Sequence, residues 1–186
     1  MRPILLILFL FPFSIDVFGI IEEQIETGGW VNRDGTPVLD TDNLKSKKGF
    51  GGWVIVTPDE DWAEKWDTPP GNTPHFNEAS SIKYGDSVTI LIFIINPAVD
   101  NNGEVNILCD IQVVRPDNTF SIDATDMECM KGELEGNPRN IRLTTPIIKF
   151  IGETGDPSGN WIVNINIVDK NRGILIPLKT GFELVQ

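Results

Sequence analysis

The most regular stretch of the chain, residues 161–167, carries an apolar side chain at every second position, with asparagine between them after Ile162. Its apolar members, two positions apart, are Trp161, Val163, Ile165 and Ile167. Successive strand side chains point to opposite faces, so this spacing predicts a half-buried antiparallel strand whose Asn164 and Asn166 face solvent. Turn residues flank it, and the apolar run 174–178 predicts a returning strand of a hairpin. Pro177 cannot donate to a ladder, which predicts a sheet edge or a bulge there.

The same pattern recurs along most of the chain. Further strands are predicted at residues 52–56, 87–95, 105–114, 119–122, 141–151 and 182–185. Clusters of Pro, Asn, Asp and Gly bound each of them. The run from Val88 to Ile95 is apolar at nearly every position, which predicts a central strand covered on both faces. We therefore expect an all-β chain folded as an antiparallel β-sandwich of about seven to eight strands.

Two segments lie outside this pattern. Residues 20–49 have no sustained periodicity and are predicted to form an extended arm, with a short hairpin around residues 32–35. Residues 58–85 form a long connection, in which Asp61 is placed to cap one helical turn from Trp62 to Trp66. Connections of this length in compact domains are often binding segments or are ordered by their own packing.

The first residues have the order of a secretory signal peptide. Arg2 precedes an apolar run over residues 4–13, and cleavage is expected after Gly19. The alternative is a membrane anchor, but a span needs about twenty apolar residues and Pro12 interrupts the run. We expect a leader at 1–19, an arm at 20–49, one domain at 50–186 and no membrane span in the mature chain. Its compartment is then periplasmic or extracellular.

The chain is strongly acidic, with a formal net charge of −12. The leader holds one charge of each sign, Arg2 and Asp16, so its removal does not change this balance. Such a surface repels nucleic acid and anionic membranes. Solubility alone explains the acidity, and an acidic face for a basic partner or a divalent cation is the alternative.

Only two cysteines occur, Cys109 and Cys129. In an oxidising compartment an even number favours a disulfide over two free thiols. A catalytic thiol is the third possibility, but it needs a base. The only histidine, His75, lies in a separate Pro-rich segment.

The connection 58–85 also holds the candidate binding site. Trp62 and Trp66 are four residues apart, so a helical turn places them on one face. Acidic neighbours would form a rim, and the Pro-rich segment would form a wall. The candidate contact residues are Trp62, Trp66, Asp61, Glu64, His75 and Phe76. Aromatic rings among acids could bind a sugar, a cationic ligand or a basic peptide. Alternatively, both indoles simply pin the loop onto the sandwich.

No catalytic residue, metal site or cofactor is predicted. The sequence has no Gly-x-Ser-x-Gly, no His-Glu-x-x-His and no phosphate-binding loop. Oxygen ligands near Asp40 and Asp100 suit calcium, but they lack the spacing of the twelve-residue calcium loop. A carboxylate-based hydrolase stays an alternative, because acids are plentiful.

Three phrases resemble the closing half of immunoglobulin-like modules of the macroglobulin or fibronectin kind, found in exported bacterial proteins. They are VVRPDNTF (113–120), DPSGNWIVNINIVD (156–169) and GFELV (181–185). The resemblance covers residues 103–186 and implies an immunoglobulin-like sandwich in an exported protein. It departs from the usual pattern at Asn118, where glycine is usual, and at Trp161, where tyrosine is usual. It transfers no catalytic residue, because this fold supports many functions.

Together these observations predict an exported, non-enzymatic module that binds a protein or a small ligand through residues 59–78. A second hypothesis is an assembly subunit of an envelope complex, in which residues 20–49 add a strand to a neighbour's sheet. The identity of the partner and the oligomeric state do not follow from the sequence.

Overall fold

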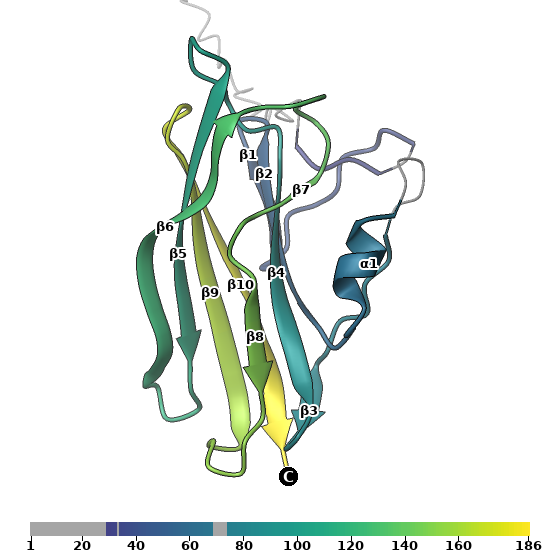
Figure 1. The fold of residues 1–186 in the computed structure, drawn as a ribbon, viewed down its shortest axis with the longest axis vertical. Coiled ribbons are helices and arrows are strands. Elements are labelled where there is room, and N and C mark those ends of the chain that lie inside the picture. Colours follow the sequence, from purple (N-terminus) through teal and green to yellow (C-terminus); the bar gives the residue numbers. More distant parts are fainter. Residues whose placement is uncertain (1–28, 33, 69–73) are drawn as a thin grey trace, which may run out of the picture.

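The computed structural model describes residues 29–32, 34–68 and 74–186, and over these ranges the chain forms ten strands and one short helix. Two five-stranded sheets pack face to face (Figure 1). The first sheet holds β1 (Leu44–Lys47), β2 (Phe50–Thr57), β4 (Ser87–Ile95), β7 (Arg142–Leu143) and β8 (Ile148–Ile151). The second holds β3 (Ser81–Lys83), β10 (Ile174–Val185), β9 (Gly159–Asp169), β5 (Glu104–Val114) and β6 (Phe120–Glu133), in that order. The predicted all-β sandwich is confirmed, with more strands than expected.

The alternating segment behaves as its pattern predicts. In β9 the apolar positions from Trp161 to Ile167 are buried in the core, and Asn164 and Asn166 lie on the opposite, half-buried face. β9 pairs with β10 over its whole length, which confirms the predicted hairpin. One face of the sheet therefore supplies the core and the other meets solvent.

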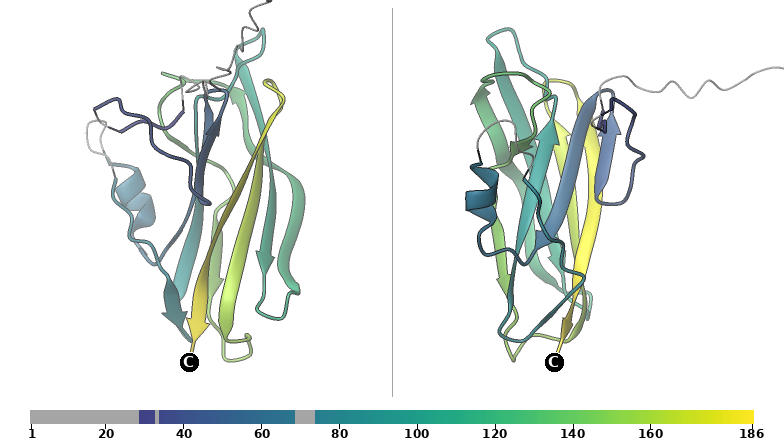
Figure 2. Two further views of the ribbon diagram at one scale, coloured as in Figure 1. Left: turned by 180° about the vertical axis from the view of Figure 1, so that it is seen from behind. Right: turned by 90° about the vertical axis from the view of Figure 1, so that its right-hand side faces the viewer.

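β4 is the central strand of the first sheet, as expected from its continuous apolar run. It pairs with β2 on one side and with β7 and β8 on the other. Ile90 and Ile92 point into the core between the sheets, whereas Leu91 and Phe93 belong to a second cluster on the outer face. That outer cluster exists because the connection after β2 covers this sheet (Figure 2).

Four predicted strands have different limits in the structure. The strand expected at 119–122 continues to Glu133 in β6. Its second part was not predicted, because three register shifts against β5 break the alternation of its side chains. The strand expected at 141–151 is two short strands, β7 and β8. The two last strands are one, β10, in which Gly181 has no room for a side chain because a Cβ would lie 2.3 Å from the carbonyl oxygen of Trp161.

The segment predicted as an arm is packed on the sandwich over its described part. Residues 44–47 form β1 and pair with β2, so the expected boundary at residue 50 falls between two paired strands. Trp30 is buried, and its indole N–H donates to the carbonyl oxygens of Lys45 (3.1 Å) and Gly52 (3.2 Å). The expected short hairpin is present as a bridge between Val31 and Pro37. The expectations for residues 1–28 lie outside the described residues.

Pro177 lies at the edge of β10 that faces away from β9, as predicted. The backbone N–H of Lys179 in β10 points away from β9 and donates to the carbonyl oxygen of Asp42 at 2.7 Å. Backbone direction alternates along a strand, so the nitrogen of Pro177 faces the same edge. β3 covers this edge only farther along, at Glu183–Val185, in a parallel pairing. The missing N–H of Pro177 therefore costs no ladder bond and discourages pairing with another chain.

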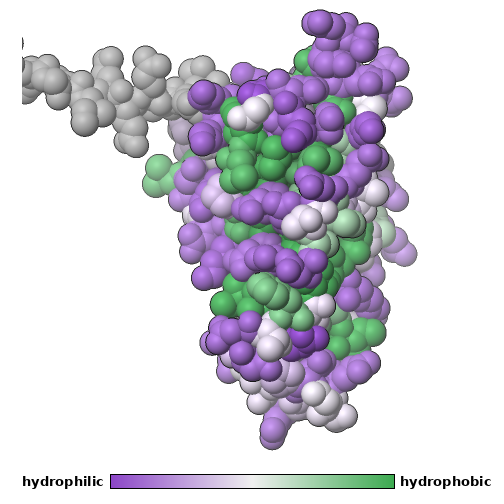
Figure 3. Space-filling view, turned by 90° about the vertical axis from the view of Figure 1, so that its left-hand side faces the viewer, coloured by the Kyte–Doolittle hydropathy of each residue, from purple (hydrophilic) through white to green (hydrophobic). Residues whose placement is uncertain are grey.

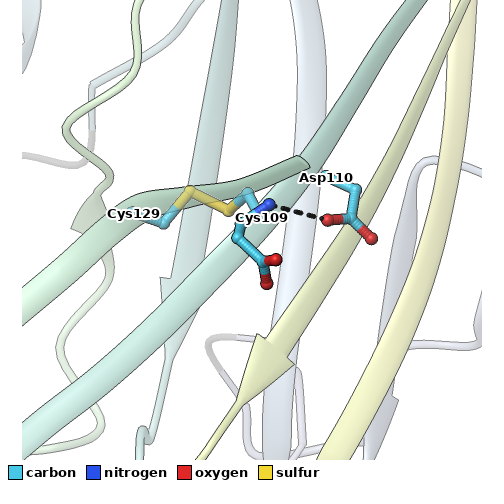
Figure 4. Close-up of a disulfide and its surroundings, with 4 residues drawn as sticks. Cys109, Asp110 and Cys129 are labelled. Atoms are coloured by element: carbon cyan, nitrogen blue, oxygen red, sulfur yellow. Dashed lines mark hydrogen bonds between the residues drawn. A yellow bond between two sulfur atoms is a disulfide. The ribbon is translucent and has the colours of Figure 1, made fainter. Parts of the chain in front are cut away.

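The two cysteines form the predicted disulfide, which joins β5 to β6 (Figure 4). Cys109 and Cys129 are fully buried, with their Cα atoms 5.8 Å apart. Beside the bond, the carboxylate of Asp110 accepts the backbone N–H of Asp126 at 3.0 Å. A buried disulfide fits an oxidising compartment. Within the described ranges, no helix has the length and apolar character needed to cross a membrane.

Candidate functional site

The predicted contact loop lies on the outer face of the first sheet. Its helix α1 (Trp62–Trp66) lies beside β4 on this face (Figure 2). The indoles of Trp62 and Trp66 are half-buried and pack on a cluster formed by Ile55, Phe76, Leu91 and Phe93. The ring centroids of Trp66 and Phe93 are 5.4 Å apart, and those of Phe76 and Phe93 are 5.7 Å apart. Both indoles therefore pin the loop to the sheet, and only part of each is left to meet a ligand.

Asp59 fixes the loop at both of its ends. Its carboxylate accepts the backbone N–H of Asn77 at 2.9 Å and the side-chain N–H of Asn77 at 2.8 Å. The ammonium of Lys65, on α1, lies 2.8 Å from the same carboxylate and 3.1 Å from that of Asp61. Burial alone would raise the pKa of Asp59, but the hydrogen bonds from Lys65 and Asn77 outweigh it and lower the pKa from 3.8 to about 2. Asp59 is thus an anion with all its partners inside the loop.

A polar cleft of about 220 Å³ opens between this loop and the sheet. The residues that line it are Thr57, Pro58, Asp59, Glu60, Trp62, Ser87, Thr89 and Lys149. One wall comes from the loop and the other from β4 and β8, where Lys149 stands directly opposite Thr89 in the strand register. The cleft offers hydroxyl groups, carboxylates and one ammonium beside the edge of an indole. Such a lining suits a hydrogen-bonding or charged group of a ligand.

An acidic rim surrounds the cleft and α1. Its members, all exposed, are Glu60, Asp61, Glu64 and Asp67. Lys65 is the one basic residue of segment 59–67 and is already engaged with Asp59 and Asp61. The rim therefore keeps an excess of negative charge that favours cationic groups near the cleft.

The structure brings together some of the predicted contact residues and separates others. Trp62, Trp66 and Phe76 share one cluster, whereas Glu64 and His75 are exposed beside it. Phe76 is buried, so it supports the loop and does not face a ligand. Asp61 lies at the start of α1, as expected, although its side chain makes no capping bond and pairs with Lys65 instead.

Sequence reasoning missed the wall that belongs to the sheet. Ser87, Thr89 and Lys149 come from strands far along the chain, and only the pairing of β4 with β8 places them beside Trp62. Thr89 gave the one usable signal, as a hydroxyl inside an otherwise apolar strand. Over the described ranges, no group of three or more His, Cys, Asp or Glu side chains is arranged to hold a metal ion.

Comparison with known proteins adds only distant likenesses. No protein-family model matches the sequence, and no curated protein matches it. Part of a family 123 glycoside hydrolase from Clostridium perfringens is similar in structure, with a TM-score of 0.40 and 8% identity over 73% of this chain and 27% of that one. The C-terminal domain of wzt gives a TM-score of 0.34 and 13% identity over 57% of this chain and 64% of that one. A Niemann-Pick type C2 protein from the Japanese carpenter ant gives a TM-score of 0.32 and 11% identity over 71% of this chain and 89% of that one. TM-scores this low transfer no activity to this chain.

Proposed function

We propose that this chain is an exported, non-enzymatic, immunoglobulin-like binding module that recognises a basic segment of a protein partner through the cleft beside α1. The observation that carries the proposal is the cleft itself, where Glu60 and Trp62 of the loop face Thr89 and Lys149 of the sheet. The buried disulfide supports the exported setting, because such bonds persist outside reducing compartments.

The chemistry of the cleft suits a long basic side chain. Its charged end would reach the carboxylate of Glu60 on the loop wall, across the cleft from the ammonium of Lys149, while its aliphatic stem lies along the exposed edge of Trp62. Asp59 is already paired, so its role is to hold the loop in the binding geometry. Because Asp59 holds α1 and Asn77 in place before binding, little conformational entropy is lost there on association.

The acidic rim would guide such a partner to the cleft. Charged rims mainly raise the rate of association and make it sensitive to salt. We therefore expect capture of the partner to weaken as ionic strength rises.

The test is binding of the mature chain to immobilised Lys- and Arg-rich peptides, compared with the same peptides carrying Gln in place of the basic residues. The triple variant Glu60→Gln, Glu64→Gln, Asp67→Asn should bind the basic peptides at least about tenfold more weakly, which corresponds to about 1.4 kcal/mol. The matched control, Glu104→Gln, Glu133→Gln, Glu153→Gln, removes the same charge from exposed positions away from the loop. Equal losses of affinity in both triple variants would show that binding depends only on net charge, which would reject the site.

The assembly hypothesis has less support, because residues 44–47 of the proposed arm already pair within this chain's own sheet. Deletion of residues 20–28 leaves β1 and Trp30 in place and tests it, since an assembly role predicts loss of a larger complex. The hydrolase hypothesis would replace the binding proposal if a glycan or peptide screen detected turnover that a single acid substitution removes.

A further inference from the structure

The outer face of the second sheet carries an ordered array of polar side chains. The strand registers place Asp110, Asn166 and Pro177 in one row across β5, β9 and β10. The next row holds Gln112, Asn164 and Lys179, and Asp123 of β6 extends it by accepting the side-chain N–H of Gln112 at 2.9 Å. We name these two rows the amide band.

Apolar rows border the amide band on both sides. Leu108, Val168 and Leu175 form the row on one side. Val114 and Ile162, with the half-exposed ring of Phe120 beyond them, form the row on the other. In Figure 3, which looks onto this face, hydrophilic bands cross the surface between hydrophobic areas.

Asn164 and Asn166 are unfavourable residues for the interior of a paired strand. Asparagine is depleted in strands, and here two occupy successive positions on the outer face of β9, which is paired on both sides. Within the described part of the chain, neither side chain makes a hydrogen bond. Residues that cost strand stability without a compensating contact are expected at functional sites. Their free donors and acceptors, half-buried among neighbours, are therefore available to a ligand in a fixed geometry.

The layout of this face does not suit a protein partner. Protein interfaces have an apolar centre and a polar rim, and here the polar rows lie in the centre with apolar rows outside. Asp110, Asp123 and the net charge of −12 also oppose nucleic acid and other polyanions.

A neutral sugar chain matches these features. Sugar hydroxyl groups both donate and accept, as carboxamides do, and the C–H faces of sugar rings can cover the flanking apolar rows. Neighbouring strands are about 4.8 Å apart, which is about the length of one pyranose unit in a linear chain, so each strand can address one unit. We propose that the amide band binds a neutral, linear glycan running across β10, β9, β5 and β6. This site is independent of the cleft beside α1.

The experiment is affinity electrophoresis of the mature, disulfide-bonded chain in gels that contain hydroxyethylcellulose, galactomannan or dextran, with anionic alginate as the charged comparison. At least one neutral polysaccharide should retard the chain. Retardation should persist at about 0.5 M sodium chloride, where charge interactions are screened within a few ångströms. Basic-peptide binding at the cleft should fail under the same salt.

The double variant Asn164→Ala, Asn166→Ala should bind the retarding polysaccharide about tenfold more weakly, because two neutral hydrogen-bonding groups are removed. The matched control Asn106→Ala, Asn160→Ala changes two asparagines of the same face that lie outside the band, on β5 and β9. It should keep wild-type retardation, as should the triple variant of the acidic rim. Thermal unfolding checks that each variant is folded, and Gln112→Ala gives a second, single-site test on β5.

Three outcomes would overturn the proposal. These are no retardation by any of the three neutral polysaccharides, equal retardation of wild type and double variant, and retardation by alginate alone.

Discussion

Asn77 donates both its backbone N–H and its side-chain N–H to the carboxylate of Asp59, at 2.9 and 2.8 Å, across 18 positions of the chain. Lys65 reaches the same carboxylate from α1, so one anion joins the start, the middle and the end of the loop. The shape of the polar cleft depends on this carboxylate remaining charged.

The stability of the loop should therefore fall in acid. The pKa of Asp59 is lowered to about 2 in the folded chain, so its contribution is present above a pH of about 4 and is lost as the pH falls through about 2. Its size is at most about 2 kcal/mol, since water in the cleft screens the charge. Denaturant unfolding followed between pH 6 and pH 2 measures it.

The variant Asp59→Asn isolates this effect, because Asp34, Asp100 and Asp117 also have lowered pKa values, from hydrogen bonds with nearby Thr36, Glu104 and Thr119. Wild type should lose more stability than Asp59→Asn between pH 4 and pH 2. Parallel curves for the two proteins would show that Asp59 is not the anchor.

Trp66 should contribute measurably to folding. Its half-buried indole contacts Phe93, and truncation opens the outer cluster to water. Full burial of a large aromatic is worth about 3 to 5 kcal/mol on truncation, so we expect Trp66→Ala to cost about 2 kcal/mol and Trp66→Phe less. Urea denaturation measures the loss, with the exposed Val99→Ala as the control. An unchanged midpoint for Trp66→Ala would instead leave the indole available mainly for a ligand.

Asp169 should be among the most sensitive polar positions. Its fully buried carboxylate accepts the backbone N–H groups of Ala98 (2.8 Å) and Arg172 (3.0 Å). Asp169→Ala leaves both part-buried donors without a partner, so we expect a loss of about 3 kcal/mol in unfolding free energy. Asp42→Ala, at an exposed carboxylate, is the matched control and should stay within about 0.5 kcal/mol. Similar losses at both positions would contradict this role.

The disulfide should stabilise the sandwich by lowering the conformational entropy of the unfolded chain. Cys109 and Cys129 are 20 positions apart, and a bond of this span is worth about 3 kcal/mol. The variant Cys109→Ala, Cys129→Ala should therefore melt roughly 6 to 12 °C lower by calorimetry. Because both sulfurs are buried, reductant should act on wild type only once it unfolds. Rapid reduction of the folded chain would contradict that protection.

Local patterns were sufficient for the long, regular strands. β4, β5 and β9 present uninterrupted apolar or alternating side chains, and their limits agree with the sequence within a residue or two. The second half of β6 was missed because its bulges shift the side chains from face to face. β1 and β3 were missed because they are short and depend on pairing with β2 and β10, which no local pattern reveals.

The candidate site was likewise predictable only where it depends on local sequence. The helical turn at Trp62–Trp66 and its acidic neighbours could be predicted from spacing. The wall from Thr89 and Lys149 could not, because their proximity follows from the register of two strands that are far apart in sequence. The amide band likewise appears only once two strand registers align Asn164 with Gln112 and Lys179.

β10 follows the other described strands along the chain and holds a central place in the architecture. β10 lies between β3 and β9, and it also packs against β2 of the other sheet. A ribosome that has reached residue 173 has therefore produced a chain without the strand that links its early and late parts. The two sheets therefore cannot close on each other before residues 174–185 have left the ribosome, and until then the strands made earlier lack their common neighbour.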